Sequence, residues 1–147
     1  MTGTLFERAL NVAVQAHWGQ TDKGGTPYIH HPIAVAANFQ IEFLQAVGLL
    51  HDVVEDTSVT LDDLFNVHLF PRAVVDAVDC LTRRQGESYK AYINRIKPNS
   101  MARAVKIADI KHNLIRDRVA DPAIRALLEK NRPMYYQALA SLDHYEA

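Results

Sequence analysis

Apolar residues recur at helical spacing along most of the chain. Between residues 4 and 18, Leu5, Ala9 and Val12 share one face at the i, i+4, i+7 spacing of an amphipathic helix. The same periodicity, with prolines or capping residues at several helix starts, predicts helices over residues 32–39, 42–54, 89–96, 100–116, 122–130 and 133–144, and others that open at Thr60 and Pro71. No stretch shows a convincing strand alternation. The pattern therefore predicts one all-α domain.

One segment breaks the helical pattern. The stretch "GQTDKGGTPYIHHP", residues 19–32, holds three glycines and two prolines in fourteen residues, a density that no regular element tolerates. We expect a long, structured loop here, between the first two helices.

Composition narrows the class of protein. With 147 residues, 48% apolar and 22% charged, the chain matches one ordinary globular domain. A formal net charge of −1 argues against a general nucleic-acid or membrane-surface binder. Cys80 is the only cysteine, so no internal disulfide and no cysteine-rich zinc site can form. The start of the chain lacks signal-peptide features, and no apolar run approaches the ~20 residues of a membrane span, so we expect a cytoplasmic protein.

The oligomeric state stays open from the sequence. Apolar positions near the C-terminus fit the core of the domain or, less commonly, an interface between subunits; they include Leu127, Leu128, Met134, Tyr135 and Leu139.

The stretch "LLHDVVEDT", residues 49–57, places one histidine and three carboxylates directly after an apolar run. Acidic groups at a helix C-terminus oppose the helix dipole and repel one another. A solvated helix end is the ordinary explanation of an HD dipeptide, but Leu49 and Leu50 directly before it favour a site close to the core. Because unpaired buried carboxylates are costly, a divalent cation would resolve the conflict.

His51 and Asp52 alone do not complete a metal shell, so further ligands must come from elsewhere in the chain. Candidates lie in "YIHHP", residues 28–32, and in "VKIADIKHN", residues 105–113. In the second segment Asp109 interrupts an apolar helical face, and Asn113 and Arg116 follow it at i+4 and i+7.

Four blocks of sequence resemble the HD-domain hydrolases of the RelA/SpoT type, specifically the single-domain small alarmone hydrolases. They are "AHWGQTDKGGTPYIHHP" (16–32), "LLHDVVEDT" (49–57), "LTRRQGESYKAYI" (81–93) and "VKIADIKHN" (105–113), in the family's order. The resemblance implies a single HD-type helical domain over residues 1–147, with its metal-site core at about residues 5–116 and C-terminal helices over 122–145. It also implies removal of the 3′-pyrophosphate of (p)ppGpp, an alarmone of the stringent response, which gives GDP or GTP and pyrophosphate.

By this resemblance the metal ligands are His31, His51, Asp52 and Asp109, where His31 is preferred to His30 because the family ligand directly precedes a proline. Two imidazoles and two carboxylates suit Mn²⁺, Fe²⁺ or Zn²⁺, and the family favours Mn²⁺.

The resemblance assigns the remaining roles as well. Glu55 and Asp56 match the acidic pair that handles the attacking water. Lys23, Tyr28, Asn113 and Arg116 are the candidates for contact with the nucleotide. His17 is expected to hold the loop by hydrogen bonds rather than to bind metal, and no role is assigned to His112.

One departure from the family pattern bears on the substrate. The family carries an arginine directly before the loop lysine, and here that position is Asp22, which cannot stack on a base as a cation. Alternatives therefore stay open: the same metal site acting on ppApp, on the 2′-phosphate of NADPH or on a nucleoside monophosphate, or a noncatalytic nucleotide sensor. Glu55 and Asp56 argue against the sensor. A small-molecule nucleotide, with neither nucleic acid nor membrane, is the expected partner.

Overall fold

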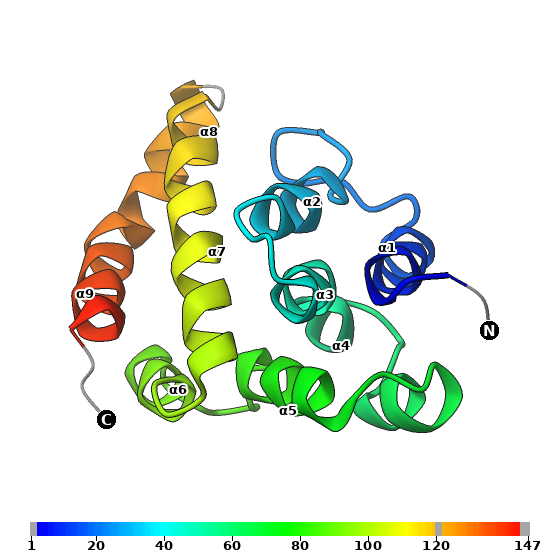
Figure 1. Cartoon of the computed structure of the whole chain (residues 1–147). Helices are drawn as coiled ribbons and strands as arrows, with labels where there is room; N and C mark the ends of the chain where they lie inside the picture. Colours follow the sequence, from blue (N-terminus) through cyan, green and yellow to red (C-terminus); the bar gives the residue numbers. More distant parts are fainter. Residues whose placement is uncertain (1–2, 120–121, 145–147) are drawn as a thin grey trace.

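The elements of the chain are helices throughout the part that the structure describes (Figure 1). The computed structural model describes residues 3–119 and 122–144 and, within the helices, not the side chains of residues 116–119, 124, 127 and 128. The elements are α1 (Leu5–Ala16), α2 (His30–Ala36), α3 (Glu42–Leu50), α4 (Val53–Asp56), a π-helical turn η1 (Asp63–Val67), α5 (Arg72–Leu81), α6 (Tyr89–Ile96), α7 (Ser100–Val119), α8 (Pro122–Leu128), a 3₁₀ turn η2 (Glu129–Asn131) and α9 (Arg132–Asp143).

The all-α prediction is confirmed. Over the described residues the one strand-like feature is an isolated antiparallel bridge between Thr21 and Pro27, inside the predicted loop. That loop is structured as expected, because the bridge closes it and Gly25 takes a φ of 83° that favours glycine.

Helix starts follow local capping chemistry. Thr4 and Glu7 form a reciprocal capping box at the start of α1. Thr60 and Asp63 bond to each other in the same reciprocal way before η1, as the sequence predicted. Ser88 caps α6 through the backbone amide of Ala91. Because these bonds are local, several helix starts could be predicted from the sequence.

Helix α3 lies at the centre of the packing. It contacts four other helices, which surround it: α1, α2, α5 and α7. Val47, Leu49 and Leu50 are fully buried, whereas Phe43, in the first turn of α3, is 39% exposed. A Cβ added to Gly48 would stand 3.1 Å from Cα of Ala36, so the glycine permits a close approach of α3 to α2.

The predicted single helix over residues 42–54 is wrong over its last four residues, which do not continue the same helix. α3 ends at Leu50, and α4 begins at Val53. The His51 ring donates from Nδ1 to the carbonyl oxygen of Gly48 at 2.6 Å, which satisfies one of the carbonyls left open at the helix end. A polar side chain thus terminates the helix where apolar periodicity alone would continue it.

Helix α7 stands between the α2–α3 pair and α9 (Figure 1). In α9, Ala138 and Leu142 are buried, and Tyr135 and Leu139 pack against the core. This supports the core role for that part of the C-terminal stripe; the side chains of Leu127 and Leu128 lie outside the described residues.

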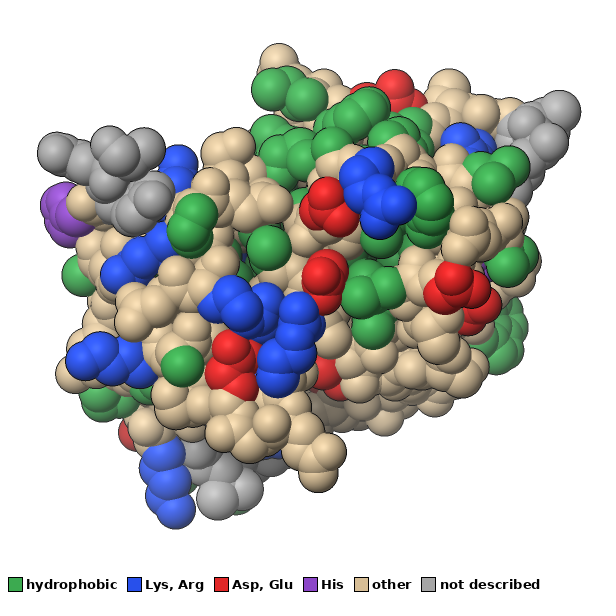
Figure 2. All heavy atoms as spheres, turned by 90° about the horizontal axis from the view of Figure 1, so that it is seen from below, with side chains coloured by type: hydrophobic (Ala, Val, Ile, Leu, Met, Phe, Trp, Pro, Cys, Tyr) green, Lys and Arg blue, Asp and Glu red, His purple; other side chains and the backbone are tan. Residues whose placement is uncertain are grey.

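The surface carries mixed charge. On the face seen from below α5 and α6, Lys and Arg side chains lie beside Asp and Glu side chains (Figure 2). Exposed Arg84 and Asp79 pair at 2.6 Å, and Arg95 pairs with Glu87 at 2.9 Å. Among the helices described here, none has the length and apolarity needed to cross a membrane.

Candidate active site

Four polar side chains from three separate segments converge beside the core. His31 lies in the first turn of α2, His51 and Asp52 lie between α3 and α4, and Asp109 lies in the middle of α7. His31 Nε2 is 2.8 Å from Asp109 Oδ1 and 3.9 Å from Asp52 Oδ2. His51 Nε2 is 3.0 Å from Asp52 Oδ2 and 3.5 Å from Asp109 Oδ1. The four predicted ligands therefore face one common point.

His51 presents one nitrogen to that point. Its Nδ1 is occupied by the Gly48 carbonyl, and its Nε2 is buried without a hydrogen bond although Asp52 Oδ2 is near. Burial alone lowers the pKa of His51, but the Asp52 and Asp109 carboxylates outweigh it and the pKa rises. If a cation replaced the Nε2 proton, this nitrogen would be directed at it from among the carboxylates, which is the geometry of a metal ligand.

His31 is oriented by a second histidine. Its Nδ1 lies 2.7 Å from Nδ1 of His112, and the two rings are stacked with centroids 5.0 Å apart. Cation binding at Nε2 places the ring proton on Nδ1, where His112 can accept it. No role was predicted for His112 from the sequence, although its position three residues after Asp109 puts both on one helix face.

Asp109 has its two oxygens engaged differently. Oδ1 faces His31 and accepts from Asn113 Nδ2 at 3.2 Å, while Oδ2 accepts from Lys106 Nζ at 2.8 Å. Burial raises the pKa of Asp109, but the Lys106 ammonium and the two histidines outweigh burial and hold this pKa well below its ordinary range. Asp109 is therefore a buried carboxylate in its ionised form.

Asp52 is held from the loop side. The Tyr28 hydroxyl donates to Asp52 Oδ2, and the Tyr28 ring lies between the rings of His17 and His31. Burial raises the pKa of Asp52, but the neighbouring His51 outweighs it and lowers the pKa to about 2. Tyr28 thus orients a predicted ligand, a role beyond the pocket wall inferred from the sequence.

The acidic pair adjoins the ligand cluster. Oxygen atoms of Asp52, Glu55 and Asp56 lie within 4.8 Å of one another. Glu55 Oε1 accepts from the backbone amide of Arg83 at 2.9 Å, which fixes its direction. Burial, followed by repulsion from Asp52 and Glu55, raises the pKa of Asp56 to about 6. Asp56 can therefore exchange a proton near neutral pH.

The loop before α2 is organised by Asp22. Its Oδ1 accepts from the backbone amides of Gly24 at 2.9 Å and Thr26 at 3.0 Å, so its carboxylate is turned into the loop. His17 is buried, and its Nδ1 lies 2.9 Å from Oε1 of Gln20. Lys23 is exposed at the same loop. Asp22 and His17 both have local structural partners.

The other sequence candidates divide into two groups. Glu55, Asp56, Tyr28 and Asn113 lie at or beside the cluster, while the side chain of Arg116 in α7 lies outside the described residues. The sequence missed Lys106 and His112, whose signal was their spacing of three residues on either side of Asp109.

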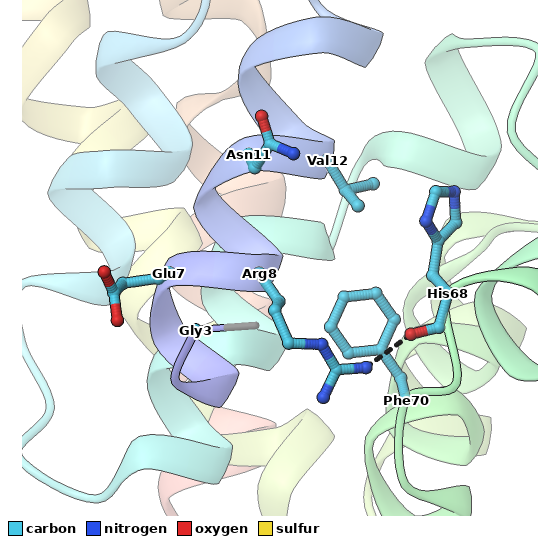
Figure 3. A pocket seen from close by; sticks show the side chains of 7 residues that line it. All are labelled: Gly3, Glu7, Arg8, Asn11, Val12, His68 and Phe70. Carbon is cyan, nitrogen blue, oxygen red and sulfur yellow. Dashed lines mark hydrogen bonds between the residues drawn. The ribbon is translucent and has the colours of Figure 1, made fainter. Parts of the chain in front are cut away.

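A separate hollow of about 230 Å³ lies beside the first half of α1, lined by residues that include Arg8, Asn11 and His68 (Figure 3). Arg8 donates to the carbonyl oxygen of His68, and its guanidinium stands 5.2 Å from the Phe70 ring. At the ~1.5 Å helical rise per residue, Arg8 is about 13 Å along the helix from His17. None of the residues that line this hollow is among the predicted site residues.

The fold and site define an all-α domain whose donor set suits a divalent cation: two imidazole nitrogens, from His31 and His51, and two carboxylate oxygens, from Asp52 and Asp109.

Comparison with known proteins agrees with this class. No family model matches the chain. The guanosine-3′,5′-bis(diphosphate) 3′-pyrophosphohydrolase of Borreliella burgdorferi is 41% identical over 80 residues, which make up 52% of this chain and 12% of that protein. The bifunctional (p)ppGpp synthase/hydrolase SpoT of Escherichia coli K12 is 34% identical over 124 residues, 74% of this chain and 17% of that protein. The chain thus spans less than a fifth of these relatives.

A solved structure shares the fold. It is described as a metazoan ortholog of SpoT that hydrolyses ppGpp, and it matches 97% of this chain and 86% of its own with a TM-score of 0.73 at 24% identity. The solved structure confirms the all-α fold, and the sequence matches confirm the resemblance of this chain to the RelA/SpoT-type HD hydrolase domain.

Proposed function

We propose that the chain is a metal-dependent pyrophosphohydrolase that removes the 3′-pyrophosphate of (p)ppGpp. The observation that carries the proposal is the convergence of His31, His51, Asp52 and Asp109 beside an acidic pair, with His51 Nε2 buried and 3.0 Å from Asp52 Oδ2. Relatives named as guanosine-3′,5′-bis(diphosphate) 3′-pyrophosphohydrolases support the choice of substrate.

The four side chains would hold one divalent cation, for which we propose Mn²⁺. When bound, the cation supplies Lewis acidity and makes a coordinated water more acidic. Tyr28 would hold the Asp52 carboxylate and His112 the His31 ring, so that the ligand atoms keep their directions. Asn113 would do the same for Asp109.

Glu55 and Asp56 would handle the water. Glu55, fixed by the Arg83 amide, would orient it, and Asp56 would accept its proton. The water oxygen bonds to the phosphorus joined to the 3′-oxygen, the bond from that phosphorus to the 3′-oxygen breaks, and a proton passes to the 3′-oxygen. The products are pyrophosphate and GDP or GTP.

Lys23 would contact a phosphate from the loop, and Tyr28 and Asn113 would border the nucleotide from the ligand side. Arg116, seven residues after Asp109 on α7, is the remaining candidate for substrate contact from the sequence, and its side chain lies outside the described residues.

The test is a substrate panel. Mn²⁺-loaded protein is incubated with ppGpp, ppApp, NADPH and nucleoside monophosphates, and the products are separated. We expect release of pyrophosphate and GDP from ppGpp. Inert ppGpp beside turnover of another panel member would overturn the choice of substrate.

A variant tests the water-handling pair in the same assay. Glu55→Gln should lower kcat by about 10²–10⁴-fold with Mn²⁺ still bound, because the carboxylate is lost and the side chain keeps its size. An unchanged kcat would remove Glu55 from the mechanism. Exposed Asp76→Asn on α5 is the control.

A further inference from the structure

Lys106 is an almost buried ammonium directly behind the candidate metal site. Its side chain is 12% exposed, and its Nζ lies 2.8 Å from Asp109 Oδ2. Nζ also stands 5.1 Å from the ring centroid of Tyr92 and 5.9 Å from that of Tyr89, so two aromatic rings complete its surroundings. The packing leaves the charge little freedom to move elsewhere.

The pairing divides the two oxygens of Asp109. Oδ2 points to Lys106, and Oδ1 points to His31 and His51. A carboxylate held in this way can offer a cation only one oxygen. Among the described residues no lysine or arginine pairs with Asp52, the second carboxylate of the cluster; it faces His51 and accepts from the neutral Tyr28 hydroxyl. The two acidic ligands are therefore supported by different chemistry.

We propose that Lys106 is a positioning residue that serves as the built-in counter-ion of Asp109: it keeps the metal-free site folded and holds Oδ1 toward the cation position. The inference rests on the metal site of the proposed function. Without Lys106, a buried carboxylate would face a second carboxylate with only histidine protonation to balance it. A bound divalent cation would supply the missing charge.

The first test is a double-mutant cycle in metal-free protein, with thermal unfolding as the readout. Lys106→Met should lower Tm by roughly 10 °C, because it leaves Asp109 buried without its counter-ion. In the double variant Lys106→Met with Asp109→Asn, the Tm loss should be clearly smaller than the sum of the two single losses. Additive losses would overturn the proposal.

Two matched variants separate charge from packing. Lys106→Arg keeps the charge and should lose less Tm than Lys106→Met. Lys111→Met removes an exposed lysine of the same helix and should change Tm by no more than about 1 °C. If Lys106→Met does not fold without metal, a folded double variant supports the proposal, and an unfolded one contradicts it.

The second test compares metal-free and Mn²⁺-saturated protein. Added Mn²⁺ should raise the Tm of Lys106→Met more than that of the parent chain, since the cation replaces the missing charge. An equal rise in both would reject the counter-ion role. Neither readout needs substrate, so the proposal can hold even if ppGpp is not hydrolysed, and it can fail while ppGpp is turned over.

Discussion

At the scale of single residues, His31, His51 and Asp109 each use one polar atom for a hydrogen bond that points away from the predicted cation position. Gly48 holds the far nitrogen of His51, and His112 holds that of His31. Lys106 holds the far oxygen of Asp109. The remaining atoms are left to face one point. The arrangement needs little rearrangement to accept an ion, and this is the physical meaning of a preorganised site.

Asp56 allows a pH prediction in metal-free protein. Its folded-state pKa of about 6 lies above its ordinary value of 3.8, so the folded chain binds this proton more tightly than the unfolded chain. The contribution of Asp56 to stability is therefore full below about pH 4 and is lost as the pH rises through about 6. Asp56→Asn should raise Tm at pH 8 and leave it nearly unchanged at pH 4.

The measurement is Tm against pH for both chains in the presence of a chelator, with Asp76→Asn as the exposed control. A Tm of Asp56→Asn at or below that of the parent chain at pH 8 would show that Asp56 is not held in a repulsive site.

Sequence reasoning at this scale identified side chains but not their supports. Two features indicated charged groups whose burial without a partner would cost much free energy. One is the acidic stretch of residues 51–56 directly after an apolar run, and the other is Asp109 inside an apolar helical face. The contact of His112 with His31 depends on how α7 meets α2, and the aromatic rings around Lys106 depend on how α7 meets α6; periodicity specifies neither. Asp22 shows the same limit: its type suggested repulsion of phosphate, while the fold turns its carboxylate into the loop amides.

At the scale of elements, the site depends on close contact between α2 and α3. The two helices carry or adjoin His31 and His51, and Gly48 is the position at which α3 approaches the backbone of Ala36. Helix starts were predictable because capping bonds are local, as at Thr4 and Thr60. The end of α3 was not, because it depends on a hydrogen bond made by the side chain of His51.

Gly48→Ala tests this contact. The new Cβ would lie 3.1 Å from Cα and 3.2 Å from the backbone nitrogen of Ala36, so α2 and α3 must separate. Overpacking should outweigh the better helix propensity of alanine and lower the free energy of unfolding by about 1–2 kcal/mol. Mn²⁺ affinity should fall as well, because the separation moves His31 relative to His51. Unchanged Tm and unchanged affinity would show that the contact does not position the site.

At the scale of the whole molecule, the helical arrangement brings together residues as far apart in the sequence as 81 positions, as in the contact between His31 and His112. The all-α class followed from periodicity, and the family followed from the order of four motifs. The central claim is that His31, His51, Asp52 and Asp109 form one metal site.

Metal stoichiometry tests that claim most directly. Purified protein is saturated with Mn²⁺ and freed of excess ion, and its metal content is measured per folded chain. We expect about one Mn²⁺ ion per parent chain. Asp109→Ala should keep the helical circular-dichroism spectrum and lose the ion. Full occupancy in folded Asp109→Ala would contradict the account.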